Sequence, residues 1–410
     1  FPSVIELGFE GIAETIQANL NTVELAISRR KTPTAEQRKK RAFYRSGLTV
    51  CDAAIQYGKR WAQHLQAQAA VEIDPQRQEE LFELASIFER VPAKPAQTFH
   101  EALQSMFVAH VILHQESFQH GISFGRMDQY LYPYLERDLA SKRITCERAV
   151  DLLGCFLGKA AELIPLFFQR ATQYFSGLSS ASGITLGGRT EDGKDAVNLL
   201  SHLFLIAYDQ IRLRQPNLHV RVHSESEPAF MDRCYEVLKK GGGMPAFFND
   251  EEVVEVLEGR GVAKAHAQDY SIVGCVEWGV PYRSFPAAGS AFMSLPYILE
   301  LTLGDGTDVS GDQVGPHTGK VEHFTDTASL LAAFRIQLKH CLQVIIDGNN
   351  AIEMAHALHR PTPMLSVLVG GCVAKGRDVT AGGAEYNSSG VQGVGMADVV
   401  DSVAAIEELV

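Results

Sequence analysis

A cysteine and a glutamate two positions apart are the side chains in this sequence best placed to perform chemistry together. They lie in Gly274-Cys275-Val276-Glu277, directly after a short run of β-type residues. A turn at Gly274 would lift the thiol out of the edge of a sheet. Cys275 and Glu277 would face the same side if the segment stayed extended. A lone cysteine after a strand is more often a small apolar core residue than a catalyst, so the pair by itself is a weak signal.

No histidine neighbours Cys275, although a catalytic thiolate ordinarily needs one as its base. The seven cysteines include no CxxC pair and their number is odd, which favours reduced thiols in a cytoplasm over a disulfide framework. The fourteen histidines include no HExxH motif and no Cys/His cluster with the spacing of a metal site. We therefore expect a cytoplasmic protein without a protein-bound metal.

A second polar segment surrounds two glycines between residues 119 and 130. His120, beside Gly121, could project into a cavity, and a core or surface position is equally compatible with the sequence. Arg126 and Asp128 are expected to be structural partners and not catalysts.

Two later segments have structural explanations. Asn249 or Asp250 is expected to cap a helix that runs to Gly259, with acidic residues in its first turn complementing the helix dipole. The glycine-rich segment 382–395 lacks the Lys-Ser/Thr pair of a P-loop and the acidic ribose partner of a dinucleotide fold. Close packing of backbone is favoured there over nucleotide binding.

The composition is that of an acidic globular protein. Hydrophobic residues make up 46%, charged residues 21%, and the formal net charge is −12. Nucleic acid is not an expected partner, because phosphate binding needs clustered Lys and Arg. The apolar runs are interrupted by polar residues and are too short for a membrane span, and no leader is recognisable. The abrupt start at Phe1-Pro2 and the helix-like final residues lead us to expect a fragment or missing ends.

The spacing of apolar residues predicts alternating helices and strands. Helices are expected near residues 75–88, 98–113, 146–163 and 196–208, the second opened by a capping box of Thr98 and Glu101. Apolar runs bounded by Gly, Pro or Asn predict strands at 184–188, 218–223, 246–248, 270–274 and 364–369. Strands separated by long helical stretches indicate an α/β fold with a mostly parallel sheet or barrel. We expect one domain over residues 1–410, with Gly311–Lys320 as a surface loop.

Several of these segments, taken in order, resemble the glycyl radical enzymes of the pyruvate formate-lyase family. The resemblance extends from about Pro92 to the end, and it rests on the collinear stretches His120–Tyr134, Arg214–His223, Gly243–Asp250, Gly274–Glu277, Arg360–Pro363 and Gly383–Asp398. It implies a ten-stranded α/β barrel of two half-barrels with surrounding helices, incomplete here at both ends, and a catalytic cysteine on a loop inside.

The same resemblance implies a radical mechanism. Cys275 would become a transient thiyl radical that takes a hydrogen atom from a small-molecule substrate. The radical would be stored on a backbone glycine and installed by a separate radical S-adenosylmethionine activase, with no other cofactor bound. A homodimer is the expected assembly. A thiyl radical needs no base, which accounts for the missing histidine, and a closed barrel would supply a cavity that excludes water.

The residues around the cysteine indicate a branch of the family. Acyl-transferring members carry two adjacent cysteines, whereas Val276 follows Cys275 here. Cys-x-Glu resembles the eliminating and decarboxylating branches, which cleave bonds from carbon to oxygen, nitrogen, sulfur or carbon, with Glu277 as general base. The alternatives are a formate acetyltransferase of the pyruvate formate-lyase type and a non-catalytic barrel fragment that binds a ligand or partner.

Two departures from the dehydratase pattern suggest an unusual substrate. The His-Asp pair of the diol dehydratases aligns with Ala288 and Gly289, and a serine of an earlier motif is replaced by Gly121. The expected substrate-binding residues are one histidine and three aromatic residues: His120, Phe248, Trp278 and Phe285. A substrate bulkier or more apolar than a small polyol is our hypothesis.

The family's radical site is an Arg-Val-x-Gly-aromatic run, and the sequence contains none. The glycine-radical domain is therefore expected to be absent from this chain. We expect the chain alone not to turn over substrate.

Overall fold

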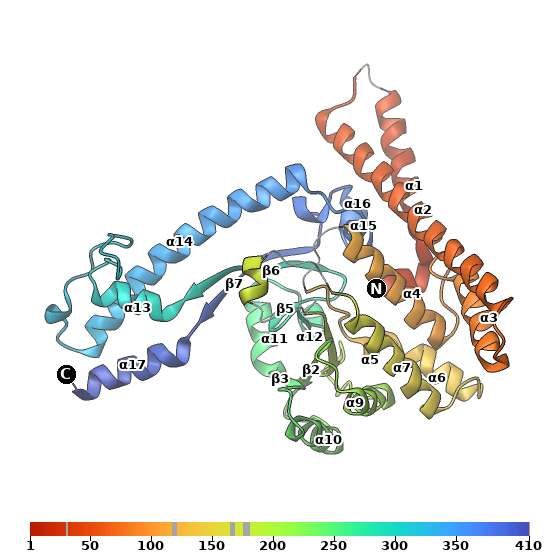
Figure 1. Ribbon diagram of the computed structural model, residues 1–410. Coiled ribbons are helices and arrows are strands. Elements are labelled where there is room, and N and C mark those ends of the chain that lie inside the picture. The colour runs from red at the N-terminus through yellow and green to blue at the C-terminus, as the bar shows by residue number, and fades with distance from the viewer. Residues whose placement is uncertain (30–31, 117–120, 165–168, 175–180, 410) are drawn as a thin grey trace. The chain divides into compact units, whose positions relative to one another are not determined.

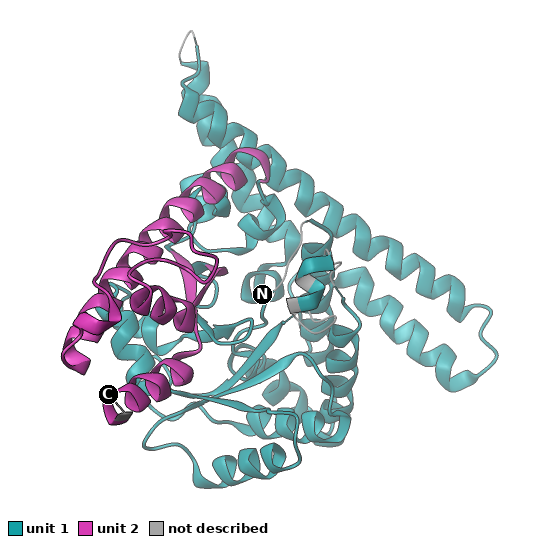
Figure 2. Ribbon diagram, turned by 60° about the vertical axis from the view of Figure 1, so that its left-hand side comes forward, with its two compact units in different colours: residues 1–286, 361–387 teal, residues 287–360, 388–410 magenta. Residues whose placement is uncertain are grey.

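The computed structural model describes residues 1–29, 32–116, 121–164, 169–174 and 181–409. They form two compact units (Figure 2). Unit 1 comprises Phe1–Pro286 and Pro361–Asn387, and unit 2 comprises Ala287–Arg360 and Ser388–Val410. The single domain expected from the sequence stays a prediction.

A parallel sheet lies at the centre of the site-bearing unit 1. Its strands β1 (Gly183–Gly187), β2 (Asn217–Val222) and β3 (Ala246–Asn249) stand in sequence order (Figure 1). Helices α9 (Leu199–Ile211) and α10 (Pro228–Lys239) connect them, as parallel strands require. All of β1 is buried, which is typical of strands covered on both faces. The predicted α/β fold and these three strands are confirmed, and within the described residues the sheet does not close.

Helices make up most of the remainder of unit 1. They are α1 (Pro2–Ser28), α2 (Ala35–Ala69), α3 (Pro75–Arg90), α4 (Phe99–Glu116), α5 (Met127–Tyr130), α6 (Tyr132–Ala140), α7 (Cys146–Ala161), α8 (Gln169–Tyr174), α11 (Asp250–Gly259), α12 (Lys264–Gln268), α15 (Pro363–Leu368), α16 (Cys372–Lys375) and the short η2 (Val379–Ala381). The four predicted helices appear as α3, α4, α7 and α9. Thr98 accepts from the Glu101 N–H as predicted, while the Glu101 carboxylate reaches the N–H of Gln97. Asn249 caps α11.

The strand predicted at 364–369 is wrong, because this segment forms α15. Pro363 stands in its first turn, where the missing N–H costs nothing. The carboxylate of Glu116, at the end of α4, accepts hydrogen bonds from the N–H groups of Met364 and Leu365 at 2.6 and 3.1 Å. An acceptor nearly 250 positions away in sequence thus satisfies the start of this helix.

Apart from the helix at its C-terminal end, the elements of unit 2 were not predicted from the sequence, and its two strands begin in unit 1. Strands β6 (Ser284–Ser294) and β7 (Tyr386–Val394) pair as a two-stranded sheet. The helices are α13 (Leu295–Leu303), η1 (Val321–His323), α14 (Thr327–His359) and α17 (Met396–Leu409). The loop expected at Gly311–Lys320 is confirmed, since it lies between α13 and η1. Close backbone packing in the glycine-rich segment is also confirmed, because a Cβ on Gly383 would lie 2.2 Å from the Arg377 carbonyl oxygen.

Helix α14 corrects the expectation about apolar runs. In the described part of the chain it is the one helix whose length and composition would allow it to cross a membrane. Length and composition alone are weak evidence for a membrane span, because apolar helices of water-soluble proteins meet the same criterion.

A buried ion pair joins the sheet to the segment that carries Cys275. The guanidinium of Arg221 on β2 binds both carboxylate oxygens of Asp250 at 2.8 Å, and neither side chain is more than 1% exposed. Arg221 also donates to the carbonyl oxygens of Gln268 and Tyr270, and the Tyr270 hydroxyl donates to Asp250. Gln268 and Tyr270 lie just before the strand that leads to Cys275.

Arg126 and Asp128 bind the C-terminal end of β1 at Gly187. Arg126 donates to the carbonyl oxygen of Gly187 at 2.9 Å and to Asp269 at 2.8 Å. Asp128 accepts from the N–H of Gly187 and from the hydroxyl of Ser201. Their interpretation as structural residues is confirmed.

Replacement of Asp250 by Asn should lower the free energy of unfolding by about 3–5 kcal/mol, because Arg221 would keep a buried charge without a counterion. Glu80→Gln, which breaks the exposed Arg77–Glu80 pair, should change it by less than about 1 kcal/mol. Urea unfolding measures both variants. A loss below 1 kcal/mol for Asp250→Asn would contradict the structural role of the pair.

Candidate active site

Cys275 lies at the tip of a short antiparallel hairpin. Strands β4 (Ser271–Val273) and β5 (Glu277–Gly279) pair with Val273 opposite Glu277, and residues 274–276 form the turn. Gly274 has a φ of +66°, a conformation that glycine adopts without strain. The predicted turn at Gly274 is confirmed, but the segment from Cys275 to Glu277 reverses direction and does not stay extended. The cysteine is exposed on the hairpin tip.

Glu277 folds back over this tip. One carboxylate oxygen, Oε2, accepts hydrogen bonds from the N–H groups of Cys275 and Val276 at 3.2 and 3.1 Å. The pKa of the Cys275 thiol is raised, first by partial burial of the sulfur and second by the charge of Glu277. The thiol therefore keeps its proton at neutral pH, which suits donation of a hydrogen atom better than attack as a thiolate.

Ser123 fixes the first residue of the turn. Its hydroxyl oxygen accepts from the N–H groups of Gly274 and Gly183, both at 2.9 Å, and its proton is donated to the carbonyl oxygen of Gly121. A Cβ on Gly121 would stand 3.6 Å from the Cα of Gly274, so this backbone lies directly against the hairpin. Ser123 thus joins the hairpin to the start of β1.

Two side chains of β2 hold the carbonyl groups of the tip. The amide of Asn217 donates to the Gly274 carbonyl oxygen at 3.2 Å, and Nε2 of His219 lies 3.1 Å from the Cys275 carbonyl oxygen. His219 is completely buried, and burial lowers its pKa to about 4. The imidazole is therefore neutral near pH 7, and its single proton lies on Nε2, because the carbonyl oxygen can only accept.

The expected substrate-binding residues occupy different surroundings. Trp278 follows Glu277 on β5, and adjacent residues of a strand point to opposite faces. The Trp278 side chain therefore lies on the face opposite Glu277, where it packs in the apolar cluster that contains Ile272 and residues of α11 and α12. Phe248 borders that cluster and forms a T-shaped pair with the His219 ring, with the two ring centroids 5.6 Å apart. Phe285 packs against the main core of unit 1. His120 lies outside the described residues. The substrate-binding role of all four stays a prediction.

Sequence reasoning missed Ser123, Asn217 and His219 as residues that hold the cysteine. All three lie in stretches on which the resemblance to the family rests, His120–Tyr134 and Arg214–His223. They are too far from Cys275 in sequence for a local motif to reveal the contact. Among the described residues, no group of three His, Cys, Asp or Glu side chains is placed to share a metal ion. A cavity of about 130 Å³ lies against the hairpin and is lined in part by Ser123 and Val273.

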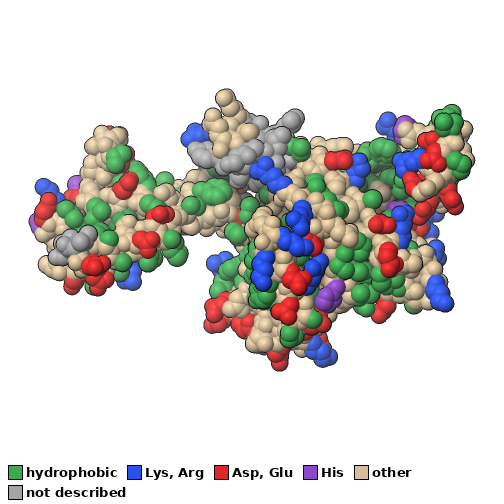
Figure 3. Space-filling view, turned by 60° about the horizontal axis from the view of Figure 1, so that its bottom comes forward, with side chains coloured by type: hydrophobic (Ala, Val, Ile, Leu, Met, Phe, Trp, Pro, Cys, Tyr) green, Lys and Arg blue, Asp and Glu red, His purple; other side chains and the backbone are tan. Residues whose placement is uncertain are grey.

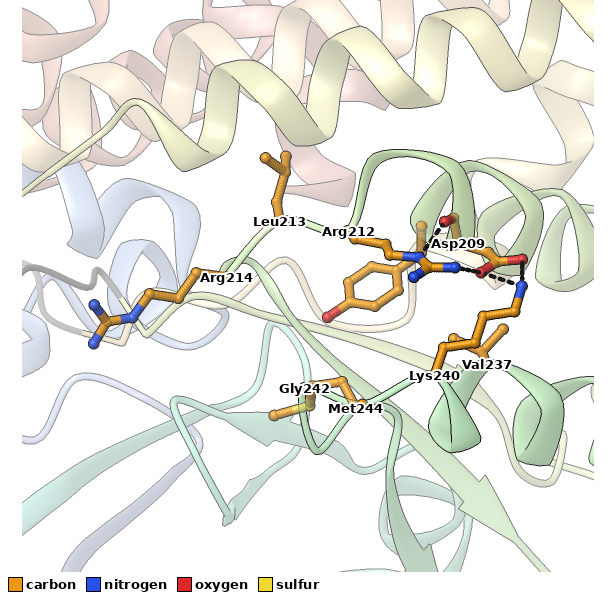
Figure 4. Close-up of a pocket in the computed structure, with 10 residues that line it drawn as sticks. Asp209, Arg212, Leu213, Arg214, Val237, Lys240, Gly242 and Met244 are labelled. Carbon is orange, nitrogen blue, oxygen red and sulfur yellow. Dashed lines mark hydrogen bonds and ion pairs between the residues drawn. The ribbon is translucent and has the colours of Figure 1, made fainter.

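A cavity of about 350 Å³ lies elsewhere, at the C-terminal ends of α9 and α10 (Figure 4). Asp209 accepts there from Lys240 and Arg233, and Arg212 approaches it to 3.6 Å. Both helices direct the negative ends of their dipoles to this place, so the basic residues neutralise helix ends and Asp209. Acidic and basic side chains are interspersed on the face that Figure 3 shows. No residue of the hairpin lines this cavity, and we assign it no part in the chemistry of Cys275.

The sequence matches the family described as pyruvate formate lyase-like over residues 1–410. The chain belongs to this family. A curated relative, the trans-4-hydroxy-L-proline dehydratase of Clostridioides difficile, is 31% identical over 412 residues, which cover 99% of this chain and 51% of the relative. The isethionate sulfite-lyase of Nitratidesulfovibrio vulgaris is 33% identical over 423 residues, which cover 100% of this chain and 50% of that protein.

Solved structures of the family share this fold. The glycerol-bound B12-independent glycerol dehydratase from Clostridium butyricum superposes with a TM-score of 0.92 at 35% identity, over 100% of this chain and 51% of that chain. The predicted membership of the pyruvate formate-lyase family and its barrel fold are confirmed. The chain spans about half the length of the curated relatives it matches.

The pH dependence of stability should carry a contribution from His219. Because its pKa is about 4 in the folded protein and 6.5 without burial, the unfolded chain binds a proton in this interval that the folded chain does not. The contribution of His219 is complete above pH 6.5 and should fall by about 3 kcal/mol as the pH drops through 4. Urea unfolding at several pH values should show a smaller decrease in this window for His219→Gln. Equal decreases in both proteins would contradict the buried neutral imidazole.

Proposed function

We propose that the complete protein is a glycyl radical lyase that cleaves a bond from carbon to oxygen, nitrogen, sulfur or carbon through a thiyl radical on Cys275. The observation that carries this proposal is the hairpin tip, where one turn presents a protonated thiol and the carboxylate of Glu277 folds back over the cysteine N–H. The dehydratase and lyase relatives support it, because their named activities are eliminations.

The proposed reaction begins and ends with the thiyl radical on Cys275. The thiyl sulfur takes a hydrogen atom from a substrate carbon, which leaves a thiol and a carbon radical. For an oxygen, nitrogen or sulfur leaving group, Glu277 accepts the proton of a hydroxyl or ammonium group on that carbon, and the leaving group departs from the neighbouring carbon with the bonding electron pair. Glu277 then passes its proton to the leaving group or to water, which returns the carboxylate for the next turnover. The product radical then takes a hydrogen atom back from Cys275 and regenerates the thiyl radical.

The complete protein needs a source for this radical. Family membership implies a radical stored on a glycine, and the absence of an Arg-Val-x-Gly-aromatic run leads us to propose that this glycine lies outside these 410 residues. A separate radical S-adenosylmethionine activase would install it. A homodimer in the cytoplasm is the proposed state of the enzyme.

The proposed substrate is bulkier or more apolar than glycerol. Gly289, at the position where the diol dehydratases have the Asp of their His-Asp pair, has a φ of +65° and carries no side chain that could bind a hydroxyl. His120, Phe248, Trp278 and Phe285 are proposed to line the substrate cavity.

Neither alternative function is favoured by a specific observation. A formate acetyltransferase would need a second thiol beside Cys275, and position 276 is an exposed valine. A non-catalytic binding protein would not need a carboxylate that closes on the cysteine N–H.

Glu277→Gln should lower kcat by roughly 10²–10⁴-fold, because the amide cannot accept the substrate proton. Its carbonyl oxygen can still accept from the tip N–H groups, so the hairpin and the yield of stored radical should hold. Glu255→Gln on the exposed side of α11 is the matched control and should leave kcat unchanged. Turnover by Glu277→Gln at the rate of the unaltered enzyme would exclude Glu277 as the base.

Glycerol and propane-1,2-diol should be poor substrates of the complete, activated enzyme. We expect kcat/KM for both to be roughly tenfold or more below that for a cyclic or phenyl-substituted alcohol, because at least one hydrogen-bonding partner of a small polyol is missing. Parallel assays with trans-4-hydroxy-L-proline and 1-phenylethane-1,2-diol make the comparison. Efficient turnover of glycerol would refute the proposed substrate class.

A further inference from the structure

The turn that carries Cys275 is fixed by side chains from outside the hairpin. Ser123 accepts from the N–H of Gly274, Asn217 donates to the carbonyl oxygen of Gly274, and His219 approaches the carbonyl oxygen of Cys275. His219 is the one of these three that binds the cysteine's own backbone. The peptide group it holds is attached to the Cα from which the thiol projects.

The two ring nitrogens of His219 have different surroundings. Nε2 lies 3.1 Å from the Cys275 carbonyl oxygen. Nδ1 is buried and has no hydrogen-bond partner within the described residues. It lies over Gly183, where a Cβ would stand only 2.9 Å from Nδ1 and 2.7 Å from Cε1. The ring can therefore pack directly against β1 because residue 183 has no side chain.

These contacts restrict what the imidazole can do. Nδ1 is buried beside Gly183 of β1, and the proton on Nε2 is engaged by the Cys275 carbonyl oxygen. The rings of Phe248 and His219 form a T-shaped pair with their centroids 5.6 Å apart. A general base would need a free lone pair directed at the substrate. The lone pair of His219 lies on the buried Nδ1, and its pKa of about 4 is far from that of a base working near neutrality.

We infer that His219 is a positioning residue, whose Nε2–H group holds the Cys275 carbonyl and thereby sets the direction of the thiol that exchanges hydrogen atoms with the substrate. The inference rests on the proposed function of Cys275. Hydrogen-atom transfer depends steeply on the distance and alignment of sulfur, hydrogen and carbon, so a displaced tip slows the chemical step and not the binding of substrate.

Three replacements separate the donor from the bulk of the ring. His219→Gln places an amide N–H near the position of Nε2 and should restore the bond to Cys275. His219→Asn places the same amide near the position of Nδ1, and His219→Leu removes the donor. His202→Asn is the control, because His202 makes an exposed contact with Glu227 that is remote from the hairpin in sequence.

In the complete, activated enzyme, His219→Asn and His219→Leu should lower kcat by roughly tenfold to a hundredfold. KM and the amplitude of the stored-radical signal should stay within about twofold of the unaltered enzyme. A factor of about two corresponds to the few tenths of a kcal/mol by which independent mutations usually deviate from additivity. His219→Gln should recover most of kcat. If all three variants lost both kcat and the stored-radical signal, His219 would have a general structural role, and the inference would be overturned.

A second readout does not need the radical. In the 410-residue chain, alkylation of Cys275 by iodoacetamide can be followed by mass spectrometry against the exposed Cys155 on α7 as an internal standard. Release of the tip should change the ratio of the two rates roughly fivefold in the Asn and Leu variants, the factor that one ordinary hydrogen bond represents. The Gln variant should keep the original ratio.

The two readouts distinguish failure of the inference from failure of the proposed function. If alkylation follows donor position while the complete enzyme shows no Cys275-dependent turnover, the positioning role stands and the proposed function fails. If turnover depends on Cys275 but neither kcat nor the alkylation ratio follows donor position, the function stands and His219 has no positioning role.

Discussion

Arg221 carries a full charge in a place where its side chain has no exposed surface. That charge is tolerated because Asp250 binds it through both oxygens and two carbonyl groups accept two of the three remaining N–H groups. The tyrosine whose carbonyl accepts, Tyr270, also donates its hydroxyl to Asp250. Since Tyr270 immediately precedes β4, the position of the Cys275 hairpin depends on this network. A partly satisfied network would leave an uncompensated charge inside the protein, so the arrangement has few alternatives.

The hairpin itself contributes little to its own rigidity. Its ladder has three residue pairs, and short isolated hairpins are marginally stable in water. The tip is held instead by three side chains from two other segments, Ser123 before β1 and Asn217 and His219 on β2, and by the Glu277 carboxylate. The backbone of the cysteine is thereby fixed, while the residue as a whole stays exposed at the tip and its sulfur is partly buried. This combination suits a sulfur that must give and take a hydrogen atom at one defined position.

The sequence predicted those features that depend on neighbouring residues. The period of apolar residues located α3 and α9, and glycine and proline marked the bounds of β1 to β3. The helix α15 was mistaken for a strand because its capping group, Glu116, comes from a distant segment. Strands β6 and β7 were missed because each is stabilised by a partner about 100 positions away, as the bond from Ser290 to Gly390 shows.

The same distinction applies to the site. Cys275 and Glu277 were found because they are two residues apart, and the carboxylate does reach the cysteine N–H. The residues that hold the turn are 56 to 151 positions away from it in sequence, so no local pattern could have identified them. Glu277 approaches Cys275 because the chain reverses direction between them. The expectation that both side chains would share a face assumed an extended segment and did not include this turn.

The most direct test of the radical role of Cys275 is electron paramagnetic resonance of the complete, anaerobically activated protein, frozen shortly after substrate is added. Cys275→Ser is the matched sample. Both proteins should show a glycine-centred doublet of similar amplitude before substrate, and only the protein with Cys275 should form product. Product formation by Cys275→Ser at the rate of the unaltered protein would contradict the thiyl mechanism.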